Sequence, residues 1–170
     1  MRLWIGLFLI FSVTSNSIIA QDQKVIEIIE AGGSTQDQKL FPGANILFKS
    51  TEKRVKLFHE GAFIVSDIAY FYAKKNYFKA IGNVVFTQGD SLKMTCETIE
   101  YDGKNKSAIA TGNVYLKRPD MTLITEKLNL DRSNDKAFYN TPGVIIDSLS
   151  TLTSDRGIYF MNLKKYRFTT

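Results

Sequence analysis

Three acidic residues recur at equal spacing along the chain, namely Glu97, Glu126 and Asp155. Two carboxyl groups facing each other can hydrolyse a glycosidic bond, one as the acid and one as the base or nucleophile. A catalytic pair needs two different environments, so that one carboxyl holds its proton and the other does not. These three residues instead follow similar apolar segments, once per copy of a repeat. We therefore expect a structural corner rather than a catalytic pair.

The other reactive side chains are few. The single cysteine, Cys96, cannot form an internal disulfide, and its place in the repeat is taken by Thr125 and Ser154 in later copies. We therefore expect a small, inward-facing position rather than a reactive thiol. One histidine, His59, gives no basis for a metal site, and the sequence offers no nucleophile–base pair or phosphate-binding loop. The sequence predicts no enzyme, no cofactor and no metal.

The first twenty residues differ from the rest. Arg2 precedes an apolar run from Leu3 to Val13, and small and polar residues then lead to Ala20 before Gln21. This order is typical of a secretory signal peptide, and the run is short for a membrane span, which needs about 20 residues. An uncleaved membrane anchor is the alternative. We predict a signal peptide over residues 1–20, a polar arm over 21–44 with an edge strand or short helix between Val25 and Ile29, and one domain over 45–170.

The formal net charge is +5, and the basic residues are scattered rather than gathered into one stripe. A nucleic-acid interface would require a basic patch or stripe, which the sequence does not provide. The excess of positive charge would favour an anionic, phosphate-bearing ligand.

From Asn45 onward the sequence repeats with a period of about 30 residues. Gly82-Asn83-Val84 reappears as Gly112-Asn113-Val114, and Pro142-Gly143-Val144 stands 30 positions further on. The second motif, Met94-Thr95-Cys96-Glu97, reappears at a spacing of 29 as Leu123 to Glu126 and Leu152 to Asp155.

Within each copy, apolar and polar residues alternate, as in Val84 and Phe86 against Val85 and Thr87. Alternation with β-branched and aromatic residues, broken by short turns such as Gly89-Asp90, predicts antiparallel hairpins. A glycine within a strand marks a bend or bulge. Hairpins bent at the same two places would stack into a folded, all-β sheet with two facing walls, open ends and an apolar trough between the walls. The side chains predicted to line this trough are Val84, Phe86, Leu92, Met94, Ile99, Tyr101, Val114, Leu116, Met121, Leu123, Leu128, Leu130, Val144, Ile146 and Leu152.

The second copy, from Ala108 to Leu116 and on through Thr125-Glu126 to Asp131, resembles the repeat of the OstA/LptA-like family of lipopolysaccharide-transport proteins. Phe78 to Asp102 and Gly61 to Tyr70 are similar to it as well, so that the resemblance covers about residues 45–168. The third copy departs from the pattern, because Pro142 replaces a glycine and Gly157 replaces a large apolar residue.

The resemblance implies a curved β-jellyroll in the periplasm of a Gram-negative cell, with the acyl chains of lipid A in its interior. It also implies partners of similar fold that join edge to edge, including further copies of this chain, and it allows an outer-membrane assembly partner. Two alternatives remain: a structural scaffold that polymerises through its edges, and a glycan-binding β-solenoid of the envelope. A filled interior would favour the scaffold, and room for alkyl chains would favour transport.

Overall fold

The computed structural model describes residues 24–169, so the expected signal peptide lies outside the described residues. The described chain forms one antiparallel sheet of 15 strands with a single 3-10 turn, Ala73–Lys75. Within this part of the chain, no helix is long and apolar enough to span a membrane. The strands are β1 (Glu27–Glu30), β2 (Gly33–Thr35), β3 (Asn45–Phe48), β4 (Val55–His59), β5 (Ala62–Ser66), β6 (Ile68–Tyr72), β7 (Tyr77–Gln88), β8 (Leu92–Asp102), β9 (Ser107–Lys117), β10 (Met121–Asp131), β11 (Lys136–Tyr139), β12 (Gly143–Asp147), β13 (Thr151–Ser154), β14 (Arg156–Phe160) and β15 (Lys165–Thr169).

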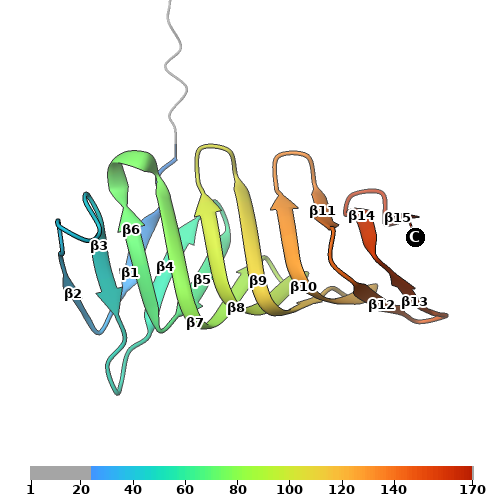
Figure 1. Ribbon diagram of the computed structural model, residues 1–170, viewed down its shortest axis with the longest axis horizontal. Coiled ribbons are helices and arrows are strands. Elements are labelled where there is room, and N and C mark those ends of the chain that lie inside the picture. The colour runs from blue at the N-terminus through green and yellow to red at the C-terminus, as the bar shows by residue number, and fades with distance from the viewer. Residues whose placement is uncertain (1–23, 170) are drawn as a thin grey trace, which may run out of the picture.

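The sheet is folded lengthwise into two walls, which run side by side along the long axis of the molecule (Figure 1). The long strands β7 to β10 contribute one half to each wall. Wall A contains β2, β3, β6, β11, β14 and β15, and wall B contains β1, β4, β5, β12 and β13. The prediction of an all-β protein built from bent antiparallel hairpins is confirmed.

The bends in β7 and β9 have a local cause in the sequence. Gly82 and Asn83 have φ of 83° and 46°, and Gly112 and Asn113 repeat these values at 83° and 47°. A left-handed conformation is readily adopted by glycine and tolerated by asparagine, so two in succession turn the strand sharply. The strand pairing shifts at these positions, between Ile81 and Val84 on β7. The repeated Gly-Asn pair is therefore the corner of the fold.

The third copy follows a different register from the one that the sequence pattern predicts. Val114 and Leu116 pair with Thr125 and Leu123 on one side of β10, and Gly143 and Ile145 pair with the same two residues on the other side. The third copy therefore lies 29 residues after the second at both motifs, and not 30 at the first. Ile145 is buried and pairs with Leu123, whereas Val144 pairs with Ile124 and faces outward. The prediction that Val144 and Ile146 face inward is wrong, because the corner of this copy lacks the left-handed Gly-Asn pair on which the alignment relied.

The segment before Asn45 is part of the sheet. β1 pairs with β4 and β2 pairs with β3, and Ile26 is buried with its N–H donated to Asn76 Oδ1 at 2.8 Å. For residues 24–44 this differs from the loose arm that the sequence predicts. The alternative of an edge strand between Val25 and Ile29 agrees with β1, whereas β2 lies outside that range.

Candidate functional site

The interior between the walls is one apolar cluster that runs through all the repeats. Most of the predicted trough residues lie in it with exposures of 5% or less, namely Val84, Phe86, Leu92, Met94, Ile99, Tyr101, Val114, Leu116, Met121, Leu123, Leu128 and Leu130. The structure thus brings these side chains together, and their contact with lipid stays a prediction. Phe86, Ile99 and Leu116 are completely buried, so this part of the interior is filled by the protein's own side chains.

The remaining three predicted residues lie elsewhere. Ile146 is 40% exposed and Val144 half-buried, both on the outer face of wall B. Leu152 pairs with Ile145 and therefore faces inward, yet it is 38% exposed because β13 ends wall B within the described chain.

Several interior residues were absent from the prediction, chiefly Leu57, Ile64, Phe78, Tyr139 and Ile145. The alternation in β4 and β5, Val55 to Ser66, was a signal that could have identified Leu57 and Ile64, since both follow the same period of two.

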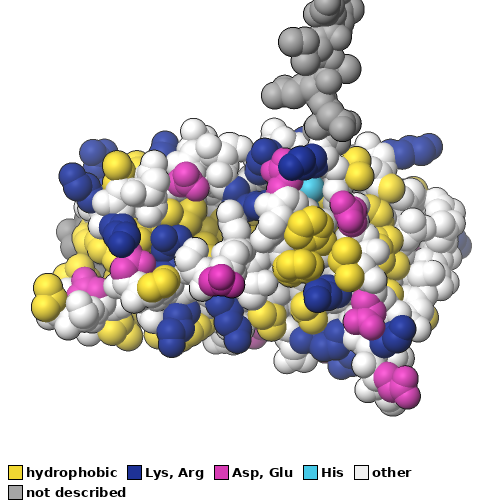
Figure 2. All heavy atoms as spheres, turned by 180° about the vertical axis from the view of Figure 1, so that it is seen from behind, with side chains coloured by type: hydrophobic (Ala, Val, Ile, Leu, Met, Phe, Trp, Pro, Cys, Tyr) yellow, Lys and Arg dark blue, Asp and Glu magenta, His cyan; other side chains and the backbone are white. Residues whose placement is uncertain are grey.

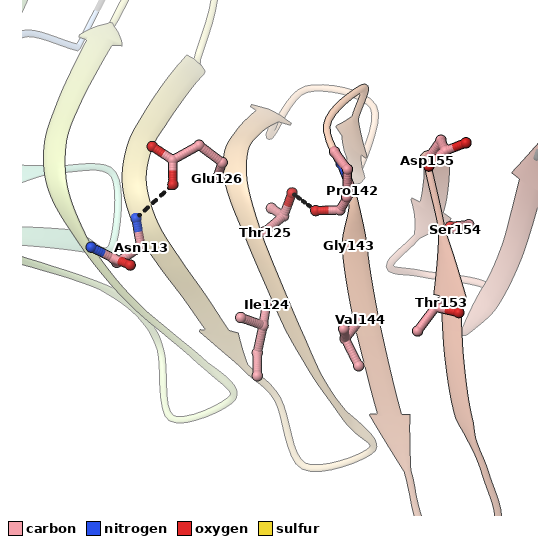
Figure 3. A pocket seen from close by; sticks show the side chains of 10 residues that line it. All are labelled: Asn113, Ile124, Thr125, Glu126, Pro142, Gly143, Val144, Thr153, Ser154 and Asp155. Carbon is pink, nitrogen blue, oxygen red and sulfur yellow. Dashed lines mark hydrogen bonds between the residues drawn. The ribbon is translucent and has the colours of Figure 1, made fainter.

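The regularly spaced acidic residues Glu97 and Glu126, together with Asp67 of the preceding hairpin, lie at the outer corner between the walls. Asn83 donates to Asp67 Oδ2 at 2.9 Å, Asn113 donates to Glu97 Oε1 at 2.7 Å, and the backbone N–H of Asn113 donates to Glu126 at 3.4 Å (Figure 3). The Asp67 carboxylate also meets Lys49 and Arg54 at 3.0 and 3.1 Å. Hydrogen bonds from Lys49 and Asn83 lower the pKa of Asp67. The carboxylates of Asp67 and Glu97 therefore accept hydrogen bonds from the side chains of the asparagines at the bends, and Glu126 accepts one from the backbone of Asn113.

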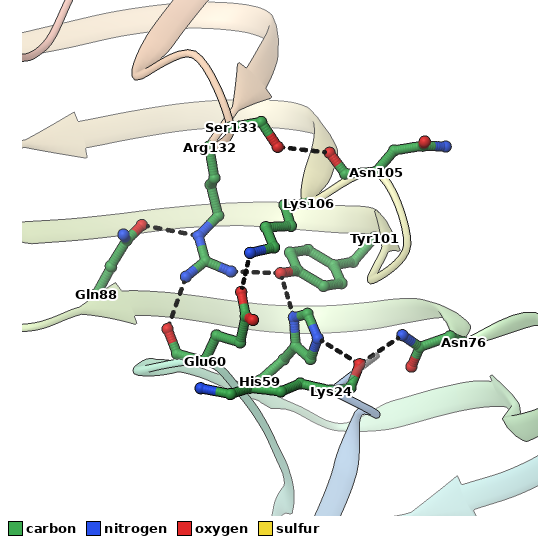
Figure 4. Close-up of polar contacts among 10 residues, drawn as sticks. All are labelled: Lys24, His59, Glu60, Asn76, Gln88, Tyr101, Asn105, Lys106, Arg132 and Ser133. Atoms are coloured by element: carbon green, nitrogen blue, oxygen red, sulfur yellow. Dashed lines mark hydrogen bonds and ion pairs between the residues drawn. The ribbon is translucent and has the colours of Figure 1, made fainter. Parts of the chain in front are cut away.

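Opposite the corner, the hairpin turns of the two walls meet along the mouth of the fold. Lys106, in a wall A turn, forms an ion pair of 2.7 Å with Glu60 in a wall B turn (Figure 4). The hydrogen bond from Lys106 lowers the pKa of Glu60. Arg132, in the next turn of wall A, donates to Gln88 Oε1 at 3.0 Å and to the Glu60 carbonyl at 2.9 Å. We call this set of contacts the first tie.

Arg132 also donates to the hydroxyl of Tyr101, which continues the first tie into the interior. Tyr101 Oη lies 2.8 Å from Nδ1 of the buried His59, and His59 Nε2 lies 3.1 Å from the Lys24 carbonyl (Figure 4). Burial raises the pKa of Tyr101, although the neighbouring Arg132 charge opposes this shift. Buried polar groups that are fully hydrogen-bonded fix one arrangement of the side chains around them. This series of hydrogen bonds therefore holds the two walls together along the N-terminal half of the mouth.

A second tie closes the mouth nearer the C-terminus. The Tyr159 hydroxyl of β14 donates to Asp120 Oδ2 at 2.7 Å, and Arg118 lies 3.4 Å from the other oxygen of the same carboxylate. The Arg118 guanidinium also lies over the Tyr159 ring, 5.7 Å from its centroid. Burial alone would raise the pKa of Asp120, but the hydrogen bond from Tyr159 and the charge of Arg118 outweigh it and lower the pKa.

Beyond the second tie the interior opens to solvent. Tyr166 and Phe168 of β15 pair with Tyr159 and Gly157 and so face inward, and the two rings are stacked with centroids 5.8 Å apart. Both rings are half-buried, and Leu152 is exposed on the opposite wall. On the face seen from behind, Lys and Arg side chains are spread between separate hydrophobic patches (Figure 2).

The arrangement encloses apolar groups. Within residues 24–169, no group of three or more His, Cys, Asp or Glu side chains is placed to hold a metal ion. Burial raises the pKa of the Cys96 thiol to about 12, which makes this cysteine a weak nucleophile.

The fold and the interior define a class of protein, the two-walled antiparallel β-jellyroll built from stacked hairpins and left open at its ends. The chain belongs to the family of OstA-like proteins, whose model matches residues 23–170. A similar solved structure is that of LptH from Pseudomonas aeruginosa, described as the LptA-homologous periplasmic component of the lipopolysaccharide transport device. The two are 20% identical with a TM-score of 0.58, over 63% of this chain and 80% of that one. None of the curated proteins matches the chain.

Proposed function

We propose that the protein is a periplasmic component of lipopolysaccharide transport, which holds the acyl chains of lipid A between its two walls. Family membership and the likeness to a periplasmic transport component support this role. Its location follows from the signal peptide expected over residues 1–20.

The observation that carries the proposal is the exposure pattern of the interior. The apolar cluster is continuous through the repeats and reaches solvent at the C-terminal end, where Leu152 of one wall and Tyr166 and Phe168 of the other face inward and are partly exposed. Burying one acyl methylene is worth about 0.8 kcal/mol, so several methylenes inserted here give useful affinity. Chains placed deeper require the walls to separate, which the two ties resist.

The partners in this proposal are proteins of the same fold. Within the described chain, β13 and β15 end the two walls at one end of the stack, and β1 and β2 end them at the other. An unpaired strand edge readily accepts a strand from another chain, and contacts between unlike edges extend a row of subunits. A neighbour docked on β13 and β15 would cover the exposed interior residues and continue the apolar path, bridging the inner and outer membrane assemblies.

A second candidate function rests on the filled interior around Phe86, Ile99 and Leu116. Since these residues leave no exposed surface of their own, the same fold would also serve as an edge-joined structural scaffold that binds no lipid. The two candidates differ in whether lipid reaches the inner faces of the walls.

Photo-crosslinking in the envelope distinguishes the two. A photoreactive phenylalanine replaces Phe86 or Leu152 on the inner faces, and in a matched control it replaces Ile109, an apolar residue 39% exposed on the outer face. Lipopolysaccharide adducts at 86 and 152 but not at 109 would support transport. A folded protein without adducts at 86 and 152 would overturn it in favour of the scaffold.

A further inference from the structure

Between the two ties, the mouth of the fold has a gap. A cavity of about 200 Å³ lies there between Leu92 and Arg118 of wall B and Asp135 and Met161 of wall A. Leu92 and Met161 are 5% and 7% exposed and belong to the interior cluster. This gap is thus a place where the apolar interior lies directly beneath the lateral surface, with polar closures on either side.

A second cavity, of about 380 Å³, adjoins the gap on the outer side of wall B and shares Ser91, Leu92 and Arg118 with it. It also contains Lys93 and Lys117, which stand directly opposite each other on β8 and β9 and are both exposed.

Like charges placed directly opposite on paired strands destabilise the pair. Neither lysine forms an ion pair with another described residue. Asp90, in the adjacent turn, is the one carboxylate among the residues lining this cavity, which also holds Lys93, Lys117 and Arg118. Arg118 is already paired with Asp120, so the positive charge that no ion pair balances is that of the two lysines. The cavity therefore carries an excess of positive charge that a bound anion would neutralise.

We infer that this pair of cavities is a lateral entry site for a phosphate-bearing lipid. The phosphate binds Lys93, Lys117 and Arg118 outside the mouth, and one alkyl chain passes between Leu92 and Met161 into the interior. The geometry suits an amphiphile, because the two cavities share Ser91, Leu92 and Arg118, so that the cations of the outer cavity lie next to Leu92 and Met161 of the interior cluster. The inference rests on the proposed transport function and adds the residues that bind the phosphate and the point where an alkyl chain enters.

The test combines charge removal with crosslinking in purified protein. A photoreactive residue replaces Met161, and Lys93→Gln/Lys117→Gln is compared with Lys74→Gln/Lys104→Gln, which removes the same charge from exposed turns of wall A. The probes are lipid A with its phosphates, the same lipid with the phosphates removed, and inorganic phosphate. We expect lipid A adducts at 161 to fall about tenfold in the first variant and to stay unchanged in the second. The dephosphorylated lipid should give fewer adducts at 161 than lipid A does, and the same number in both charge variants.

Other outcomes would overturn the inference. Adducts at position 86 but none at 161, or equal crosslinking in both charge variants, would leave the transport function standing and place entry elsewhere, as at the open C-terminal end. Protection of Lys93 from acetylation by inorganic phosphate as strongly as by lipid A would show a site for free phosphate instead. Absence of adducts at 86, 152 and 161 would remove the transport function together with the entry site.

Discussion

Tyr139 and Gly157 form a matched pair, in which the glycine makes room for the ring. A Cβ added at Gly157 would lie 2.6 Å from Tyr139 Oη, closer than two such atoms can approach. The two residues are direct partners on β11 and β14. In the earlier copies the corresponding partners are the small Ala110 and the large Ile99 and Leu128. The large and the small residue have thus exchanged strands in the third copy.

This exchange predicts strong coupling between positions 139 and 157. Tyr139→Ala alone should lower the free energy of unfolding by about 3 kcal/mol by leaving a cavity, and Gly157→Leu alone by about 2 kcal/mol or more by overpacking. The double variant restores the Ala–Leu pairing and should lose at least about 1 kcal/mol less than the sum. Urea denaturation measures all three. Strict additivity would mean that the two positions do not share the space.

The Gly112 corner can be tested in the same way. Gly112 has φ of 83°, and an added Cβ would lie 2.6 to 2.8 Å from atoms of the Glu97 side chain. Gly61 has a similar φ of 79° with nothing within 4 Å, so Gly61→Ala reports the backbone strain alone. We expect Gly112→Ala to destabilise the protein by about 2 kcal/mol and Gly61→Ala by about 1 kcal/mol. Equal losses would show that Glu97 moves aside freely.

Arg132 is predicted to hold the mouth closed. Arg132→Ala removes donors to Gln88, the Glu60 carbonyl and Tyr101, and should cost about 2 kcal/mol, since hydrogen bonds to charged groups are stronger than neutral ones. Amide hydrogen exchange should become faster in the turns at 60–61 and 89–91. Arg156→Ala, at an exposed position on β14, is the matched control. It should change neither the free energy of unfolding nor the rate of amide exchange in these turns. Unchanged exchange in Arg132→Ala would mean that the walls are held together by the apolar interior alone.

The sequence predicted the architecture well because the alternation and the Gly-Asn pairs act locally. Val84, Phe86, Val114 and Leu116 were assigned correctly to the interior for that reason. Ile146 was assigned wrongly, because the third copy begins one residue earlier than the motif spacing predicts. Without the Gly-Asn pair, nothing in the local sequence marks this shift.

The ties across the mouth could not be predicted from spacing. Arg132 and Glu60 are 72 positions apart, and nothing in the repeat marks either of them. They meet because the fold brings successive turns of opposite walls together. Polar contacts between distant turns depend on the finished fold, whereas strands and corners depend on neighbouring residues.

The ion pair between Glu60 and Lys106 predicts a dependence of stability on pH. The pKa of Glu60 is lowered in the folded protein, chiefly by the hydrogen bond from Lys106. Its contribution to stability is therefore complete above the unfolded pKa of about 4.3 and is lost as the pH falls through the lower folded value. Lys106→Met should cost at most about 1 kcal/mol at pH 7 and nothing once Glu60 is protonated. Lys104→Met, in the same turn, should show no pH-dependent difference; the same pH-dependent loss in both variants would indicate a general charge effect.

Cys96 offers a direct measure of how often the walls separate. The side chain is 6% exposed, and burial raises the pKa of its thiol to about 12. At pH 8 the thiolate fraction is then about a thousandfold lower than in the unfolded chain, so a disulfide reagent should modify the native protein far more slowly than the protein in urea. Arg132→Ala should accelerate this reaction if the first tie limits opening, whereas Arg156→Ala should not. Rapid modification of the native protein would show instead that the interior is already accessible, which would allow acyl chains to enter without any separation of the walls.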